Sequence, residues 1–184
     1  MKQIFVTIAV WLMALVFASA QFKLPTLPYK YSALEPYIDS TTMYIHLNNH
    51  QATYVNNLNK ALEKYPDLQK KTIFELFNSL STLPADIQTA VRNNGGGYYN
   101  HNIFWTTLAP AGSTSISPEL EAKIKESFGS VEVMKTEFEK AALNRFGSGW
   151  AWIIKDDTGK LKIVTTPNQD NTLMSVINVK GKPI

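Results

Sequence analysis

The histidines of this 184-residue chain are the first feature whose type and spacing could do chemistry, because there are only three of them. His46 and His50 lie four residues apart in the stretch YIHLNNHQATYVNNLN, and Tyr54 follows after four more. Residues four apart lie above one another on a helix, so these three side chains would share one face. Taken alone, the pair is equally compatible with polar surface residues or with a buried structural histidine.

The third histidine, His101, lies in the stretch NHNIFW, which is expected to be helical. Imidazole is the commonest metal ligand near neutral pH, and two helices that each present one histidine can build a metal site in a helical bundle. His46 and His101 are therefore candidate metal ligands. Structural cores and hydrolases also pair histidines in this way, but no carboxylate or nucleophile motif lies beside either histidine.

The composition excludes several other functions. The net charge is only +3 and no dense Lys/Arg run occurs, so we expect neither a nucleic-acid partner nor a membrane-surface partner. Cysteine is absent, which excludes zinc-finger ligation, cysteine nucleophiles and iron–sulfur chemistry. Apolar residues make up 45% of the chain, enough for a globular core.

Residues 1–20 have the pattern of a secretory signal peptide. Lys2 precedes an apolar run, and Ala18-Ser19-Ala20 supplies the small residues of a cleavage site before Gln21. The run is short for a membrane span. We therefore expect a secreted, extracellular protein that has no membrane attachment after the signal peptide is cut.

The candidate ligands must be positioned by helices that precede a small sheet. We expect helices at 40–64, capped by Ser40, Thr41 or Thr42, and at 72–80, 84–92 and 98–108, with a flexible glycine run at 93–97. A linker at 110–113 leads to helices at 117–128 and 131–144. Two strands follow from residue 150, joined by a turn at 156–159. The fold class is α+β: a helical-hairpin domain at 21–109, then an α/β domain at 114–184 with a small antiparallel sheet.

Several of these stretches resemble one family. MYIHLNNHQATYVNNLN is similar to the pattern M-x-I-H-x-x-x-H-x-x-Y-V-x-x-x-N of iron/manganese superoxide dismutases. LPTLPYKYSALEPYID resembles the family's lead-in and NNGGGYYNHNIFW its second ligand helix. FEKAALNRFGSGWAW and TTPNQD resemble the beginning and end of its first β-hairpin. The similarity extends over residues 22–184.

The resemblance implies a role for each candidate residue. His46 and His101 would be two of four protein ligands of one metal ion, and His50 and Tyr54 would line the substrate funnel. Gln169 would hold the metal-bound solvent, and Trp105 and Trp150 would form an apolar wall. Trp150 and Trp152 are equally well explained as core aromatics. The substrate would be superoxide, and the protein would be a homodimer or homotetramer.

The resemblance also bears on the metal. Iron-type enzymes typically have a glutamine four residues before the second ligand histidine, where this chain has Gly97, and the glutamine occurs instead at Gln169. That arrangement resembles the manganese type, so Mn is the expected cofactor and Fe the alternative. The position of the glutamine matters because a hydrogen-bond donor to the bound solvent tunes the metal.

One part of the family pattern is missing. The remaining Asp and His ligands come from a motif D-x-W-E-H-A-Y, which does not occur in this sequence. We therefore expect a truncated chain with an incomplete carboxy-terminal domain, an exposed sheet edge and a third strand supplied by the missing part. The function is superoxide dismutation if those ligands exist in the natural chain. The alternative is a non-enzymatic secreted fragment or binding protein with an incomplete metal site.

Overall fold

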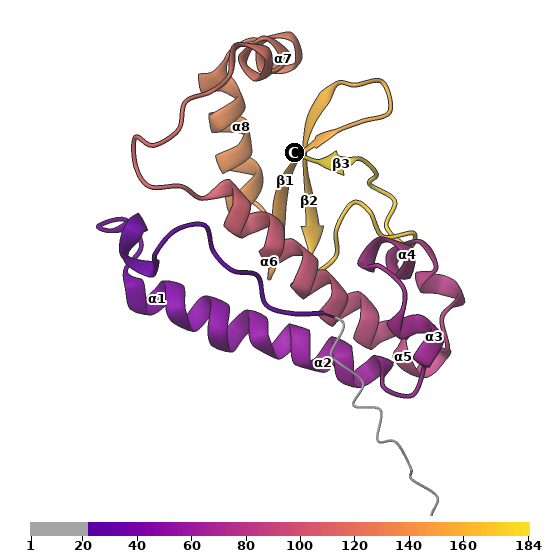
Figure 1. Ribbon diagram of the computed structural model, residues 1–184. Helices are drawn as coiled ribbons and strands as arrows, with labels where there is room; N and C mark the ends of the chain where they lie inside the picture. The colour runs from indigo at the N-terminus through magenta and orange to yellow at the C-terminus, as the bar shows by residue number, and fades with distance from the viewer. Residues whose placement is uncertain (1–21) are drawn as a thin grey trace, which may run out of the picture.

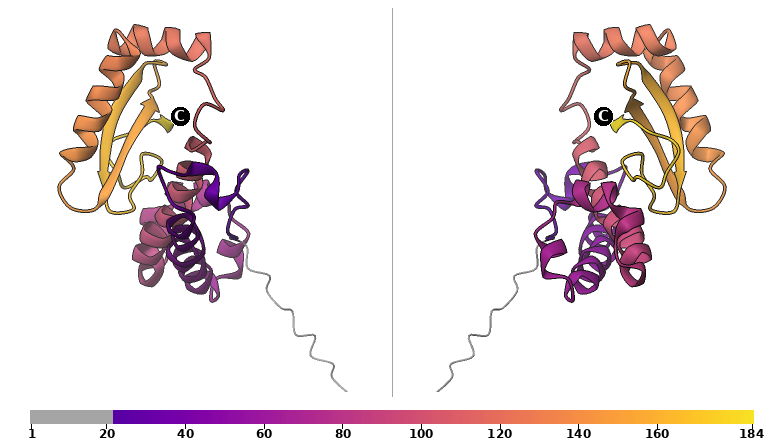
Figure 2. Two further views of the ribbon diagram at one scale, coloured as in Figure 1. Left: turned by 90° about the vertical axis from the view of Figure 1, so that its left-hand side faces the viewer. Right: turned by 90° about the vertical axis from the view of Figure 1, so that its right-hand side faces the viewer.

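The computed structural model describes residues 22–184, so the expected signal peptide lies outside the described residues. Two long helical stretches run side by side in opposite directions, with a small sheet above them (Figure 1). The side views place the sheet and its two helices as a second layer beside the helical hairpin (Figure 2). Helices followed by an antiparallel sheet confirm the expected α+β class.

The first long stretch consists of α1 (Ser40–Ile45), the π-helical segment η2 (His46–Gln51) and α2 (Ala52–Leu62). A short 3-10 turn, η1 (Tyr31–Leu34), precedes it. The expected caps at residues 40–42 were wrong by one position. The N-cap is Asp39, whose Oδ1 accepts a hydrogen bond from the Thr42 amide at 2.9 Å and so satisfies one of the free amides of the first turn.

The second long stretch consists of α5 (Ala85–Ala90), the π-helical segment η4 (Val91–Gly95) and α6 (Gly96–Thr107). The glycine run that the sequence suggested to be flexible is therefore helical. A β-carbon at Gly96 would lie 2.0 Å from the Gln169 carbonyl oxygen, and one at Gly97 would lie 2.4 Å from the Tyr54 ring. Glycine is needed here because other chain segments approach the helix closely.

Short helices join the two long stretches and close the core. They are α3 (Pro66–Gln69), α4 (Ile73–Asn78) and η3 (Leu80–Thr82). Thr72 and Glu75 form a capping box at the start of α4. This helix lies within the range 72–80 that the sequence predicted. The main buried cluster is shared by these helices, the two long stretches and the segment after β2 (Leu161–Pro167); its most buried side chains are Leu58, Leu76, Phe77, Val91 and Met174.

The second domain contains α7 (Pro118–Phe128), α8 (Val131–Leu143) and a three-stranded antiparallel sheet in the order β2-β1-β3. The strands are β1 (Gly149–Lys155), β2 (Leu161–Pro167) and β3 (Lys182–Pro183). In the β1–β2 register Trp152 lies opposite Val164. Helix α8 packs along one face of the sheet, and α7 lies across its end, where it contacts β2 (Figure 2).

The third strand corrects an expectation, because we expected it to come from residues outside this chain. Lys182 and Pro183 instead pair antiparallel with Lys155 and Ile154. Two residues at one edge of β1 are therefore paired with β3, a strand of this same chain. Among the described residues, no helix is both long and apolar enough to cross a membrane.

The hairpin turn gives a prediction about pH. The Lys162 ammonium and the Thr158 hydroxyl hold the pKa of the Asp156 carboxyl well below its usual range. A lowered folded-state pKa stabilises the fold above the ordinary carboxyl pKa, and this stabilisation is lost as the pH falls. We expect Asp156→Asn to lower Tm at neutral pH, with the difference shrinking below about pH 4.

Thermal unfolding followed by circular dichroism from neutral to acidic pH measures this effect. Asp157→Asn is the matched control, since Asp157 is its exposed neighbour in the same turn. A Tm difference for Asp156→Asn that does not change with pH would contradict the assignment.

Candidate metal centre

The three histidines converge between the two long helical stretches. The ring centroids of His46 and His101 lie 5.0 Å apart, those of His50 and His101 5.1 Å apart, and those of His46 and His50 5.4 Å apart. One nitrogen of each ring lies within 4.8 Å of the others. His46 and His101, which the sequence analysis predicted to face each other from two helices, are therefore close together in space.

Both histidines of the first stretch lie in the π-helical segment η2, which the sequence did not reveal. Single π-helical turns inside α-helices are frequent at functional sites. Despite the altered turn, His50 still packs against Tyr54, with ring centroids 5.1 Å apart. The expected line of His46, His50 and Tyr54 along the helix is retained.

His101 is held in one orientation. Its side chain is 2% exposed, and its Nδ1 lies 2.7 Å from the Gly97 carbonyl oxygen one turn earlier. A hydrogen bond from Nδ1 to a carbonyl leaves Nε2 as the nitrogen with a free lone pair, the usual arrangement for a metal-binding histidine. Burial lowers the pKa of His101 to about 4 and also lowers the pKa of His46, so both rings are neutral at pH 7 and able to bind a cation.

A chain of hydrogen bonds runs beside the histidines. The Gln169 Nε2 donates to the Tyr54 hydroxyl at 3.1 Å, and the Trp150 Nε1 donates to the Gln169 Oε1 at 3.1 Å. Both aromatic rings also pack on His101, with centroid distances of 5.5 Å for Tyr54 and 5.1 Å for Trp150. Burial raises the pKa of Tyr54, which keeps its hydroxyl protonated. The structure thus brings Gln169, distant in sequence, to the Tyr54 side of the histidines.

Gln169 is held by residues that the sequence did not reveal. The Asn100 Nδ2 donates to the Gln169 carbonyl oxygen at 3.0 Å, and the Asn171 Nδ2 donates to the Asn100 Oδ1 at 3.0 Å. Both asparagines are fully buried. The only hint in the sequence that these residues matter was the position of Asn100 directly before His101. These bonds connect α6 to the segment after β2.

Arg92 and Asp170 form a second link between the same segments. The guanidinium Nε and one terminal nitrogen donate to the two carboxylate oxygens at 2.6 and 2.7 Å. The Asp170 side chain is 4% exposed and that of Arg92 is 43% exposed. Asp170, directly after Gln169, is therefore bound on both carboxylate oxygens by Arg92.

We expect Arg92→Met to destabilise the fold by about 1–3 kcal/mol, because it leaves a buried carboxylate without its charged donor. Arg145→Met, at an arginine near the start of β1, is the matched control and should have little effect. Urea unfolding of both variants measures the difference. Equal stabilities of the Arg92 variant and the control would contradict a structural role for this pair.

The tryptophans differ in their surroundings. The Trp105 Nε1 donates to the Gln51 Oε1 at 2.6 Å, and Trp105 packs on His46 with a centroid distance of 4.9 Å. Gln51 is fully buried, and through this hydrogen bond it holds Trp105 against His46. Trp152 is a core residue that donates to the Thr166 hydroxyl.

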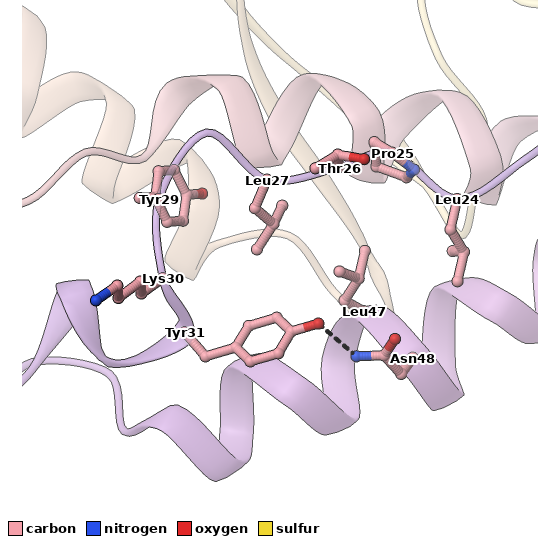
Figure 3. A pocket seen from close by; sticks show the side chains of 9 residues that line it. All are labelled: Leu24, Pro25, Thr26, Leu27, Tyr29, Lys30, Tyr31, Leu47 and Asn48. Atoms are coloured by element: carbon pink, nitrogen blue, oxygen red, sulfur yellow. Dashed lines mark hydrogen bonds between the residues drawn. The ribbon is translucent and has the colours of Figure 1, made fainter.

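A groove on another side of the first helix is separate from this centre. Figure 3 shows residues 24–31 lying over the helix, with Leu24, Leu27 and Leu47 directed into the space between them. The groove has a volume of about 460 Å³, and the Asn48 amide donates to the Tyr31 hydroxyl at 2.9 Å across it. None of its lining residues is a histidine or an acid.

The donor set fits a first-row transition metal. Neutral imidazoles suit such ions, His101 is oriented by a second hydrogen bond, and aromatic rings surround the nitrogens. The fold therefore defines a helical-hairpin protein with a candidate histidine metal centre between its two long helices and its sheet.

Comparison with known proteins identifies the family. The alpha-hairpin domain of iron/manganese superoxide dismutases matches residues 21–109, and the C-terminal domain of the same family matches residues 116–184. The chain belongs to the iron/manganese superoxide dismutase family.

The similar proteins include several manganese enzymes by name. Superoxide dismutase [Mn] of Thermus thermophilus is 54% identical over 153 residues, which cover 83% of this chain and 75% of that protein. Superoxide dismutase [Mn] 1 of Leptolyngbya boryana is 50% identical over 162 residues, 88% of this chain and 64% of the other. That of Yersinia enterocolitica is 47% identical over 165 residues, 89% and 79% of the two chains.

Proposed function

We propose that this protein is a superoxide dismutase that uses Mn, with Fe as the alternative metal, held in part by His46 and His101. The observation that carries the proposal is the convergence of these two neutral imidazoles beside the Tyr54–Gln169–Trp150 chain in a member of this family. A bound redox metal would take one electron from one superoxide and give one to another, which yields oxygen and, with two protons, hydrogen peroxide.

The protein's residues would supply protons and shape the site. The Tyr54 hydroxyl, kept protonated by burial, can hold a proton that Gln169 orients through its amide. His50 is exposed beside Tyr54 and would line the approach of the substrate. Trp105 and Trp150 pack on the ligand rings and would exclude water from them.

The first experiment tests whether the family's Asp and His ligands complete the site. The 184-residue chain is compared with the same chain extended at Ile184 by the carboxy-terminal segment of the Thermus thermophilus relative. We expect the extended chain, loaded with Mn, to dismutate superoxide rapidly. An inactive extended chain that binds Mn would overturn the proposed function and favour the alternative, a non-enzymatic binding protein.

A second prediction concerns Gln169. We expect Gln169→Ala in the extended, Mn-loaded chain to lower activity about 10- to 100-fold, the usual effect of losing an outer partner of a metal site. Gln169→Asn is the matched variant: it retains the amide but is too short to reach both Tyr54 and Trp150, so it should also lose activity. Full activity in both variants, at equal Mn content, would contradict the role.

Export and self-association are further parts of the proposal. The family match begins at residue 21, directly after Ala18-Ser19-Ala20, which supports cleavage there and a secreted protein.

Leu143 and Phe146 are 79% and 93% exposed, which supports a homodimer or homotetramer that covers them. The intact mass of the secreted protein and light scattering in solution test these two parts separately.

A further inference from the structure

The connector between the two domains, residues 108–117, forms an open loop between the end of α6 and the start of α7 (Figure 1). Within residues 22–184, the longest uninterrupted run of exposed residues is 111–120. A β-carbon built at Gly112 would meet no atom within 4 Å. An enzyme that must surround the chain can therefore reach this loop from outside.

The backbone of the connector is held at one point. The Ser113 amide and the Ser113 hydroxyl both donate to the Pro110 carbonyl oxygen, at 3.0 and 2.7 Å. In the described part of the chain, residues 114–116 make no hydrogen bond. This stretch can therefore change its conformation without breaking contacts elsewhere.

Two other exposed loops are held more firmly. In the hairpin turn, the Asp156 carboxylate accepts hydrogen bonds from the amides of Thr158 and Lys160, both at 3.0 Å. In the loop at 144–148, the Ser148 carbonyl accepts one from the Asn168 amide at 2.8 Å. Proteolytic cleavage favours exposed loops of small and polar residues whose backbone is free of such bonds. The connector meets these requirements better than either of these loops.

The two domains are also joined by a route that does not use the connector. The segment after β2 continues from the sheet but packs into the helical core, where Met174 is fully buried. The Ser175 amide donates to the Phe77 carbonyl oxygen at 3.0 Å, and Arg92 binds both oxygens of the Asp170 carboxylate. These contacts would remain if the connector were cut.

We propose that the Ala111–Gly112 bond is an endoprotease site, and that its cleavage leaves the two parts folded together as one particle. The enzyme would have a small primary pocket, as elastase has, which accepts alanine before the bond that is cut. Among the described residues, the alanines outside helices and strands are Ala109 and Ala111, and Ala109 precedes Pro110, before which most proteases do not cut. In the cleavage, water adds its hydroxyl to the Ala111 carbonyl carbon and its hydrogen to the Gly112 nitrogen, which leaves a new carboxylate and a new ammonium.

Limited digestion of the 184-residue chain with elastase, followed by intact mass, tests the site. We expect the first cut within residues 22–184 to follow Ala111. Ala111→Asp should slow this cut about 10-fold or more, because a charged side chain is costly in a small apolar pocket. Ala122→Asp, at an exposed alanine inside α7, is the matched control and should be cut at the wild-type rate. A first cut at another bond of this range, or an unchanged rate for Ala111→Asp, overturns the site.

Native size exclusion of the cut protein tests the association. We expect both pieces to elute together, and Met174→Ser to raise the concentration needed for this about 30-fold or more, because it removes buried apolar volume. Met134→Ser, on α8 and outside both buried clusters, is the matched control. Circular dichroism before digestion verifies that the variants are folded. Wild-type pieces that separate, or Met174→Ser pieces that associate as firmly as the control, overturn the second contact route. Neither measurement uses a metal or dismutase activity, so failure of the proposed function leaves both results unaffected.

Discussion

Replacing His101 by alanine is expected to lower metal affinity by about 100- to 1,000-fold. A structural zinc site contributes roughly 10–16 kcal/mol through four ligands, so one ligand accounts for about 2.5–4 kcal/mol. His101 is the most constrained of the three imidazoles, since it is buried and its Nδ1 is held by the Gly97 carbonyl. Its loss also removes the ring on which Trp150 and Tyr54 pack.

A second variant separates ligation from packing. His101→Phe keeps an aromatic ring between Trp150 and His46 but has no nitrogen to bind a metal. We expect both variants to lose metal, measured by metal analysis and titration calorimetry, while His101→Phe unfolds at a higher temperature than His101→Ala without metal. Wild-type metal affinity in His101→Phe would show that His101 is not a ligand.

Replacing Gly96 by alanine is expected to destabilise the fold by about 3 kcal/mol or more. The new β-carbon would lie 2.0 Å from the Gln169 carbonyl oxygen and 2.9 Å from the Met174 methyl group. The first of these atoms belongs to the backbone and cannot rotate away, so either α6 or the segment after β2 must shift. For a domain of this size the loss corresponds to a fall in Tm of about 6–12 °C.

The adjacent glycine is the matched control. A β-carbon at Gly95 would meet the ends of two flexible side chains, Ile73 at 3.1 Å and Phe77 at 3.3 Å. Alanine also favours a helix over glycine by about 1 kcal/mol, which offsets part of that crowding. We expect Gly95→Ala to unfold within a few degrees of wild type in calorimetry. A Gly96→Ala variant as stable as Gly95→Ala would contradict the close approach.

The close approach at Gly97 gives a physical reason for one part of the resemblance to the manganese type. A β-carbon at this position would lie 2.4–2.6 Å from three atoms of the Tyr54 ring. A glutamine here would therefore displace Tyr54 from its present place. The amide that contacts Tyr54 comes instead from Gln169, whose Nε2 donates to the ring's hydroxyl.

Local patterns in the sequence determined the candidate ligands and most of the elements. The four-residue spacing of His46, His50 and Tyr54 predicted their common line, because such neighbours are fixed by helix geometry alone. The helices expected from residues 72, 117 and 131 are present, and the structure caps them with Thr72, Ser117 and Ser130, each of which accepts a hydrogen bond from an amide of the first turn. The change of period after residue 149 likewise predicted the two long strands.

Tertiary contacts decided the rest, because these depend on segments far apart in the chain. The glycine run at 93–97 reads as flexible by itself, and it is helical because Gln169 and Tyr54 pack against it. Asn100 and Gln169 are 69 residues apart, and Arg92 and Asp170 are 78 apart, so no local pattern could pair them. The sequence thus determined which imidazoles were available, and packing between the hairpin and the segment after β2 placed the amide beside them.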